Sequence, residues 1–361
     1  MNKEALSFEK LSDGTLEAKI ISTEEEIIIP EYLGDKKITR VSTGEIQGVE
    51  KIKRVKLPMG VKEIAPSAFS GFSSLRDINI PEGVCSVGGS AFYGCHSLRS
   101  VLLPASLEVM EGVIFGDCPA LVEICVDRDN PVFCSVDGNL YTKDKSKLIL
   151  YAKGKEEREL VIPEDTAEIA EYAFSGVRRL EKIKIGKSLT KIGSNAFTRC
   201  LSLKEIEVDA ENAAYSSLSG NLYNKDKSVL IQYAVGKEDI SFSVPDTVKI
   251  IDDGAFTDAK RLVEVILPLS VREISHYAFF GCKSLAKLHG GKGLSYIGES
   301  AFEDCESLIE IKIPKAVEYI EYFAFSGCSS LTILAECEEM PPDWYFGIEN
   351  DVAEIVFSAE V

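Results

Sequence analysis

A 23-residue spacing of phenylalanine is the feature that most constrains how this chain can fold. A fixed period of about 20–50 residues is typical of a solenoid, in which every repeat adds one coil to a stack. We therefore expect coils piled so that equivalent side chains lie above one another, with the phenylalanine pointing inward. The interval separates the members of three runs: Phe69, Phe92 and Phe115; Phe174 and Phe197; Phe256, Phe279, Phe302 and Phe325.

Each repeat predicts two short strands. The segment Leu-x-x-Ile-x-Ile alternates with period two at its end and is often closed by proline, which stops a strand. The segment Val-x-x-Ile on the return part of the coil predicts a second, shorter strand. The Ala-Phe-x-x-Cys segment is too short for an independent helix and predicts one helical or 3-10 turn. The expected fold class is a mainly β solenoid with about 4.8 Å between coils.

Two longer intervals predict inserts within the stack. Phe115 to Phe174 and Phe197 to Phe256 are each 59 residues, which is one 23-residue repeat plus 36. The extra segments, at about residues 130–160 and 212–242, are copies of each other with turn residues between apolar runs. This pattern favours two hairpin-like inserts. The predicted organisation is an N-terminal cap (1–37), a solenoid (38–336) and a C-terminal cap (337–361) that holds the only tryptophan, Trp344.

Six of the ten cysteines occupy one position of the repeat, three residues after the phenylalanine. A single repeat position predicts a buried column of small side chains, not a set of disulfide pairs. The absence of a Cys-x-x-Cys pair argues against zinc, and we expect neither a metal nor another cofactor. The six residues are Cys95, Cys118, Cys200, Cys282, Cys305 and Cys328.

The charge of the chain excludes some classes of partner. A formal net charge of −18 argues against nucleic acid and against anionic lipid surfaces. No apolar run reaches about 18 residues, so no membrane insertion is expected. The first five residues, Met1–Ala5, lack the pattern of a signal peptide, which leaves a cytoplasmic protein and a trimmed, exported one as alternatives.

Motifs for catalysis or ligand binding are weak, and we expect no enzyme. The three histidines, His96, His276 and His289, fall at different repeat positions, and no Gly-x-Ser-x-Gly elbow is present. Residues 290–293, Gly-Gly-Lys-Gly, lack P-loop spacing and favour a glycine-rich turn. The acidic loops 127–130 and 209–212 could ligate calcium, but they lack the EF-hand frame, so solvated turns are expected.

The outward positions of Leu-x-x-Ile-x-Ile form the candidate partner-binding face. These x residues point away from the core and vary from repeat to repeat, which suits either a recognition surface or an unconstrained solvated one. Leu102, Cys125 and Ile266 are apolar where water is expected, which favours a contact patch. The candidate residues are Asp77, Asn79, Leu102, Glu123, Lys182, Lys184, Glu205, Glu264, Ile266, Lys287, His289, Glu310 and Lys312.

The repeat resembles a known family. The pattern Ala-Phe-x-Gly-Cys-x-Ser-Leu-x-x-Ile-x-Ile-Pro-x-x-Val-x-x-Ile, over about residues 20–340, is similar to the BspA-type, or Treponema pallidum-type, leucine-rich repeat. The resemblance implies a right-handed leucine-rich-repeat superhelix with a concave parallel sheet. It also implies a surface or secreted protein that adheres to host matrix proteins or to other cells.

These observations lead to two hypotheses of function. The first is a non-enzymatic interaction or adhesion module, expected to be a monomer, that binds a protein or glycan partner through the solenoid surface, with the candidate residues on its concave face. The second is a self-associating structural protein or cytoplasmic scaffold, suggested by the aromatic residues of the C-terminal cap. The resemblance implies a cell-surface or secreted location, and the cytoplasm remains the alternative.

Overall fold

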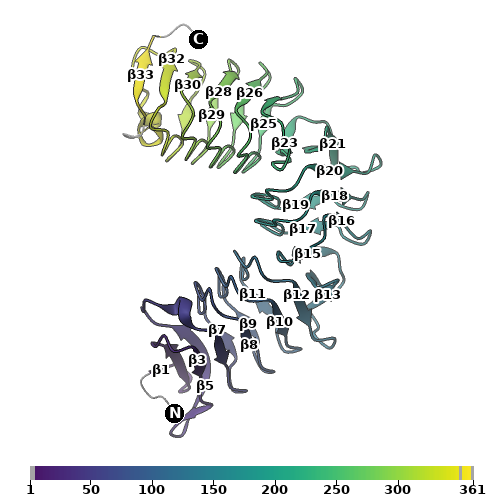
Figure 1. The fold of residues 1–361 in the computed structure, drawn as a ribbon, viewed down its shortest axis with the longest axis vertical. Helices are drawn as coiled ribbons and strands as arrows, with labels where there is room; N and C mark the ends of the chain where they lie inside the picture. Colours follow the sequence, from purple (N-terminus) through teal and green to yellow (C-terminus); the bar gives the residue numbers. More distant parts are fainter. Residues whose placement is uncertain (1–4, 349–351, 359–361) are drawn as a thin grey trace. The chain divides into compact units, whose positions relative to one another are not determined.

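The computed structural model describes residues 5–348 and 352–358 and divides the chain into two compact units, Met1–Glu156 and Glu157–Val361 (Figure 1). Each unit is a stack of coils with almost no helix, which confirms the expected mainly β solenoid. Two parallel sets of strands recur in both units. Strands from Leu-x-x-Ile-x-Ile form the first ladder, and the shorter strands from Val-x-x-Ile form the second ladder.

In the first unit the second ladder is the longer set. Along its path β1-β2-β5-β7-β9-β11, the first pair of strands is antiparallel and the other four pairs are parallel. The first ladder holds β3 (Glu26–Ile28), β6 (Arg54–Lys56), β8 (Asp77–Asn79), β10 (Ser100–Leu103) and β12 (Glu123–Val126). The second ladder holds β1 (Leu6–Lys10), β2 (Leu16–Ile20), β5 (Lys36–Thr43), β7 (Glu63–Ile64), β9 (Ser86–Val87) and β11 (Val109–Met110). A short strand pairs with β5, and one 3-10 turn precedes β6: β4 (Tyr32–Leu33) and η1 (Val49–Lys51).

In the second unit both ladders continue through the last coils of the stack. The first ladder holds β16 (Glu159–Val161), β18 (Lys182–Ile185) and β20 (Glu205–Val208), then β24 (Ser241–Ser243), β26 (Glu264–Leu267), β28 (Lys287–Gly290), β30 (Glu310–Ile313), β32 (Thr332–Ala335) and β33 (Glu354–Phe357). The second ladder holds β17 (Glu168–Ile169) and β19 (Lys191–Ile192), then β25 (Ile250–Ile251), β27 (Glu273–Ile274), β29 (Tyr296–Ile297) and β31 (Tyr319–Ile320). The 3-10 segment η2 (Pro342–Gly347) precedes β33, and no helix in the described ranges is long and apolar enough to cross a membrane.

The two inserts are three-stranded antiparallel excursions, as expected. In the second unit, Leu230 of the third insert strand pairs in parallel with Ile251, so the insert rejoins the second ladder. The strands of the first insert are β13 (Phe133–Val136), β14 (Asn139–Thr142) and β15 (Lys147–Leu150), and those of the second are β21 (Tyr215–Leu218), β22 (Asn221–Asn224) and β23 (Val229–Gln232).

A buried asparagine anchors the start of each insert. The side-chain amide of Asn130 donates to the carbonyl oxygens of Pro104 and Leu107, and its own oxygen accepts from the N–H groups of Val132 and Phe133. Asn212 makes the equivalent four hydrogen bonds in the second unit. Both side chains are fully buried, and these bonds meet the whole hydrogen-bonding capacity of their N–H groups. The solvated-turn prediction for the two acidic loops is therefore wrong for this last residue of each.

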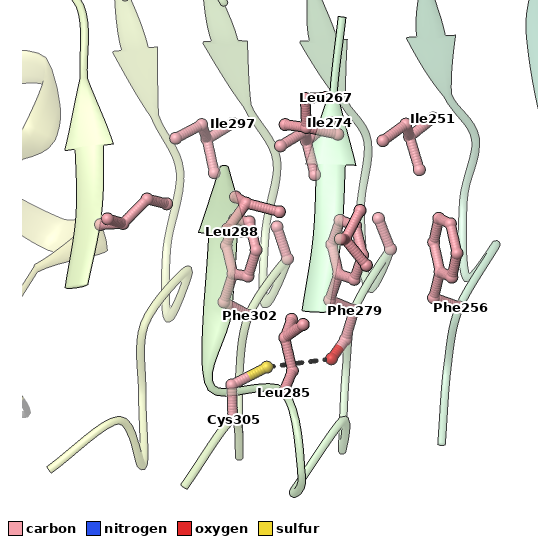
Figure 2. Close-up of a cluster of buried hydrophobic side chains, with 14 of the residues drawn as sticks. Ile251, Phe256, Leu267, Ile274, Phe279, Leu285, Leu288, Ile297, Phe302 and Cys305 are labelled. Atoms are coloured by element: carbon pink, nitrogen blue, oxygen red, sulfur yellow. Dashed lines mark hydrogen bonds between the residues drawn. The ribbon is translucent and has the colours of Figure 1, made fainter. Parts of the chain in front are cut away.

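The repeat phenylalanines stack within each unit. Ring centroids lie 5.2 Å apart from Phe69 to Phe92 and from Phe92 to Phe115. In the second unit, Tyr233 of the insert heads a stack that continues through the repeat phenylalanines, with centroids 4.6–5.4 Å apart and nearly parallel planes between them (Figure 2). The alignment of equivalent side chains, on which the solenoid prediction depended, is thus confirmed inside each unit.

The turns that carry these rings form a further set of contacts between coils. The N–H of Phe279 donates to Ala301 of the next coil, whereas Ala278 and Phe280 donate three residues back. The same alternation recurs in the first unit, where Phe69 donates to Ala91. The predicted 3-10 turns are present, but each is isolated. They do not continue into a helix because every second N–H group bonds to the neighbouring coil.

The cysteine column completes this connection. The thiol of Cys305 donates to the carbonyl oxygen of Phe279 in the preceding coil at 3.2 Å (Figure 2). Equivalent bonds of 3.0–3.3 Å are made by Cys95, Cys118, Cys200, Cys282 and Cys328, and all six side chains are buried. Cysteine suits this position because it combines a small apolar side chain with a weak S–H donor.

Phe279→Ala tests the ring stack. The substitution opens a cavity between the rings of Phe256 and Phe302, so we expect the free energy of unfolding to fall by about 3–5 kcal/mol. Phe323→Ala is the control, because this ring is 56% exposed, and its effect should stay within about 0.5 kcal/mol. Urea denaturation followed by far-UV circular dichroism measures both. Equal effects of the two substitutions would contradict the stack.

Thiol labelling tests the burial of the cysteine column. Burial raises the pKa of Cys118 and Cys282 to about 12, so almost no reactive thiolate forms at mildly alkaline pH. We expect iodoacetamide to modify the exposed Cys85 in the native protein and the column only after denaturation. Mass spectrometry of tryptic peptides gives the rate at each site. Labelling of Cys282 as fast as Cys85 in the folded chain would contradict the assignment.

Candidate binding face

The ladder face consists of the outward side chains of the first ladder, and all thirteen predicted residues lie on it. Along β18 the pattern is alternating, with Ile183 and Ile185 buried and Lys182 and Lys184 only partly covered. The structure brings the predicted residues together within each unit. Asp77, Asn79, Leu102 and Glu123 lie in the first unit, and the other nine lie in the second.

Opposite charges face each other across neighbouring strands of the second unit. Lys182 lies opposite Glu205 in the register, and its amino group contacts Glu205 at 3.1 Å and Glu207 at 2.7 Å. Lys184 pairs with Glu159 at 2.6 Å. These side-chain hydrogen bonds lower the pKa of Glu207 and of Glu159. Because these groups neutralise one another in solvent, this part of the ladder face fits the solvated interpretation.

The ladder face of the first unit contains a hollow where strand pairing stops. Strand β8 pairs with β6, but no pairing joins it to β10 among the described strands. On the β6 side of β8, the side chain of Asn79 bonds the N–H and the carbonyl oxygen of Leu57, both at 3.1 Å. The resulting space has a volume of about 580 Å³ and is lined by Ile78 and by Leu102, which is 57% exposed. Its rim carries Arg54, Lys56, Arg76 and Asp77.

A second hollow interrupts the ladder face of the second unit. Strand β28 pairs with β26 along four residues, but with β30 only at Lys287 and Glu310. The strands diverge after that point, where Gly290 and Gly291 have positive φ angles of 86° and 81°. The space between them measures about 470 Å³. Its lining includes Leu288, Ile309, Lys287, His289, Lys292, Glu310 and Lys312.

Both hollows have more positive than negative charge at their rims, although the chain as a whole carries −18. In the first unit Glu26 pairs with Arg54 at 3.4 Å and with Lys56 at 3.1 Å. In the second unit His289 contacts Glu264 at 2.8 Å, while three lysines surround the opening. A cationic rim around partly exposed apolar side chains can attract an acidic surface and then bury apolar contacts.

Sequence reasoning missed four of the rim residues. Arg54 and Lys56 stand 23 residues before Asp77 and Asn79, so extending both columns by one repeat would have found them. Arg76 and Lys292 lie just outside the strands, where the x positions do not reach.

Comparison with known proteins identifies the repeat. The sequence matches the family described as the BspA type leucine rich repeat region, in six copies, over residues 26–132, 151–229 and 237–341. The chain belongs to the BspA-type leucine-rich repeat family. No curated protein sequence matches it.

Solved structures share the BspA-type fold. A leucine rich cell surface protein from Faecalibacterium prausnitzii A2-165 is similar with a TM-score of 0.56 and 23% identity, covering 100% of this chain and 95% of that one. The pneumococcal vaccine antigen PcpA is similar with a TM-score of 0.54 and 19% identity, covering 100% of this chain and 88% of that one. At these identities the likeness concerns the fold.

One histidine of this BspA-type chain lies among carboxylates. His276, Glu299 and Glu321 have side-chain ligand atoms within 4.8 Å of one another, and the 23-residue spacing of His276 and Glu299 could have indicated that these two are neighbours. The Nδ1 atom of His276 accepts the N–H of Glu299 at 3.0 Å and lies 3.4 Å from Glu321. Since that lone pair is already engaged, the ring would have to turn before this nitrogen could bind a metal ion.

The acidic loops make local turns at their exposed end. Asp127 accepts the N–H of Asp129, and Asp209 accepts that of Glu211, each through a carboxylate oxygen. At the glycine-rich turn, the carbonyl oxygen of Gly293 accepts a hydrogen bond from Arg272 of the preceding coil, which also donates to Leu269. These contacts are those of structural turns, since they satisfy the polar groups of the turns themselves.

A half-buried acid near the second ladder, Asp252, gives a pH-dependent test. Burial, with a smaller contribution from Asp253 and Glu273, raises the pKa of Asp252 from 3.8 to about 6. The folded chain therefore binds more protons than the unfolded chain between these values, and stability falls as pH rises through this window. Asp252→Asn should raise the free energy of unfolding at neutral pH by about 3 kcal/mol and flatten its pH profile.

Denaturation between mildly acidic and neutral pH measures this effect. Asp246→Asn is the matched control, because Asp246 is exposed and its replacement should leave the slope unchanged. An unaltered slope in Asp252→Asn would contradict this assignment.

Proposed function

We propose that this protein is a non-enzymatic binding protein whose ladder face engages an acidic surface of a protein partner. The observation that carries the proposal is the pair of cation-rimmed hollows, one in each unit, where the first ladder is interrupted. The BspA-type solenoid supports it, since stacked repeats typically present extended binding surfaces.

The size and lining of the hollows favour protein side chains as occupants. Volumes of about 580 and 470 Å³ leave room for side chains of a partner protein. Ile78, Leu102 and Ile309 supply apolar contact area inside them. The contact energy would come from these side chains, while the lysine and arginine rims would guide association.

Adhesion at a cell surface is the wider role that we propose for this binding. One similar solved structure is described as a cell surface protein, and another as a vaccine antigen. The ladder face would then supply the adhesive contact without any chemical step.

Self-association remains a second candidate for one specific reason. Strand β33 is the last strand of its sheet, and its free edge could pair with another chain. The tryptophan that suggested this role, Trp344, is buried and offers no outward contact. Sedimentation velocity over a range of concentrations decides the point, because a monomer at all of them would count against self-association.

Charge reversal at the second hollow tests the proposed binding face. Immobilised wild-type protein is used to capture proteins from candidate host material, and the affinity of each captured protein is then measured. We expect Lys287→Glu/Lys312→Glu to lower the affinity for a captured acidic partner by about tenfold, which corresponds to about 1.4 kcal/mol of binding free energy.

Lys62→Glu/Lys260→Glu is the control, because it changes the net charge equally at exposed lysines outside the ladder face. It should bind as the wild type does at physiological salt. If both double variants bind every captured protein with unchanged affinity, the hollow of the second unit is not the binding face.

A further inference from the structure

Two coils of the second unit meet directly although an insert separates them in sequence. The turns that follow Phe197 and precede Phe256 lie so close that a Cβ atom on Gly254 would fall 2.3 Å from Oδ1 of Asn195. Across the same contact, Nε of Arg199 lies 3.1 Å from a carboxylate oxygen of Asp258. In the core of the same coil, Tyr233 of the second insert stacks on Phe256, with ring centroids 5.1 Å apart.

The meeting of these turns leaves a small notch with an aromatic wall. Its volume is about 200 Å³, and its wall contains the rings of Tyr172, Tyr277 and Phe280. The rings of Tyr277 and Phe280 meet edge to face, with centroids 6.1 Å apart. Tyrosine rings placed in this way offer an apolar face and a polar tip in the same site.

Hydroxyl and amide groups form the rest of the notch. Thr198 and Thr257 are buried, and Ser175 and Asn195 are half-buried. The hydroxyl of Thr257 donates to the carbonyl oxygen of Tyr277 at 2.9 Å, so its lone pairs stay available as acceptors. The hydroxyl of Thr198 donates to the carbonyl oxygen of Asn195 at 2.9 Å and lies 3.2 Å from the hydroxyl of Ser175.

The one charged residue among the described residues that line the notch is paired. Arg199 contacts Asp258 and also lies over the ring of Phe280, 5.6 Å from its centroid. These two contacts hold the guanidinium group in place, and an anionic ligand would have to break the pair to reach a positive charge. The hydroxyl of Tyr277 donates to the carboxylate of Glu299 at 3.4 Å, so this edge of the notch also disfavours an anion.

We propose that this notch binds one neutral pyranose residue of a glycan. The C–H face of a sugar ring packs on aromatic rings, and its hydroxyl groups need donors and acceptors in alternation, which is the combination assembled here. The volume lies below the range of about 300–1,000 Å³ for larger ligands, so a single ring fits better than a longer ligand. The site lies on the phenylalanine turns, away from the ladder face, so it is separate from the protein-binding site proposed above.

Saturation-transfer difference NMR on the full chain tests the proposal. The probes are the methyl glycosides of glucose, galactose, mannose and N-acetylglucosamine, together with methyl glucuronide and acetylated amino-acid amides. We expect ring C–H signals from at least one neutral glycoside. Tyr172→Ala/Tyr277→Ala should reduce these signals at least tenfold.

Two further variants keep the result interpretable. Tyr93→Ala removes an exposed ring at the repeat position equivalent to Phe280 in the first unit and should leave the signals unchanged. Asn195→Gly removes the amide at a residue whose φ is 57°, which glycine accepts, and should weaken binding at least fivefold even where the double variant does not fold.

Three results would overturn the assignment. One is the absence of transfer to any neutral glycoside. Another is transfer only to the glucuronide or only to the amino-acid amides, which would make the notch a charged-ligand or protein-side-chain pocket. The last is transfer that persists at full strength in the folded notch variants.

Discussion

Contacts between neighbouring coils hold each unit together, because a single coil cannot bury its own apolar side chains. Phe279 illustrates this dependence at one residue. Its ring lies between two other rings, its N–H bonds to the next coil, and its carbonyl oxygen accepts the thiol of Cys305. Stability in such a stack is close to a sum of coil and interface contributions, so every coil stabilises only its immediate neighbours.

The parts of the fold that repeat were predictable from sequence. The spacing of phenylalanine and cysteine fixed two core columns, and the alternation in Leu-x-x-Ile-x-Ile placed all thirteen candidate side chains on the outside. The roles of Asn130 and Tyr233 were not predicted. Asn130 hydrogen-bonds backbone groups of the preceding coil, and Tyr233 extends the ring stack; both roles depend on three-dimensional contacts that a spacing does not express.

The candidate site was only partly predictable, for a related reason. The alternation in the sequence predicted its residues, but it did not predict the hollows among them. A hollow arises where the backbone pairing of two strands stops, and side-chain alternation does not show where that happens. Gly290 and Gly291 were recognised as a turn, yet their positive φ angles decide where β28 leaves β30. In the first unit, the amide of Asn79 bonds the backbone of Leu57, and β8 makes no pairing with β10.

The break between β28 and β30 also has a mechanical consequence. On the same pair of coils the rings of Phe279 and Phe302 remain stacked, and β29 still pairs with β31. Two sides of this coil junction are therefore held by contacts, and on the third side one residue pair joins the strands. Widening the ladder face at this junction would therefore break few backbone hydrogen bonds.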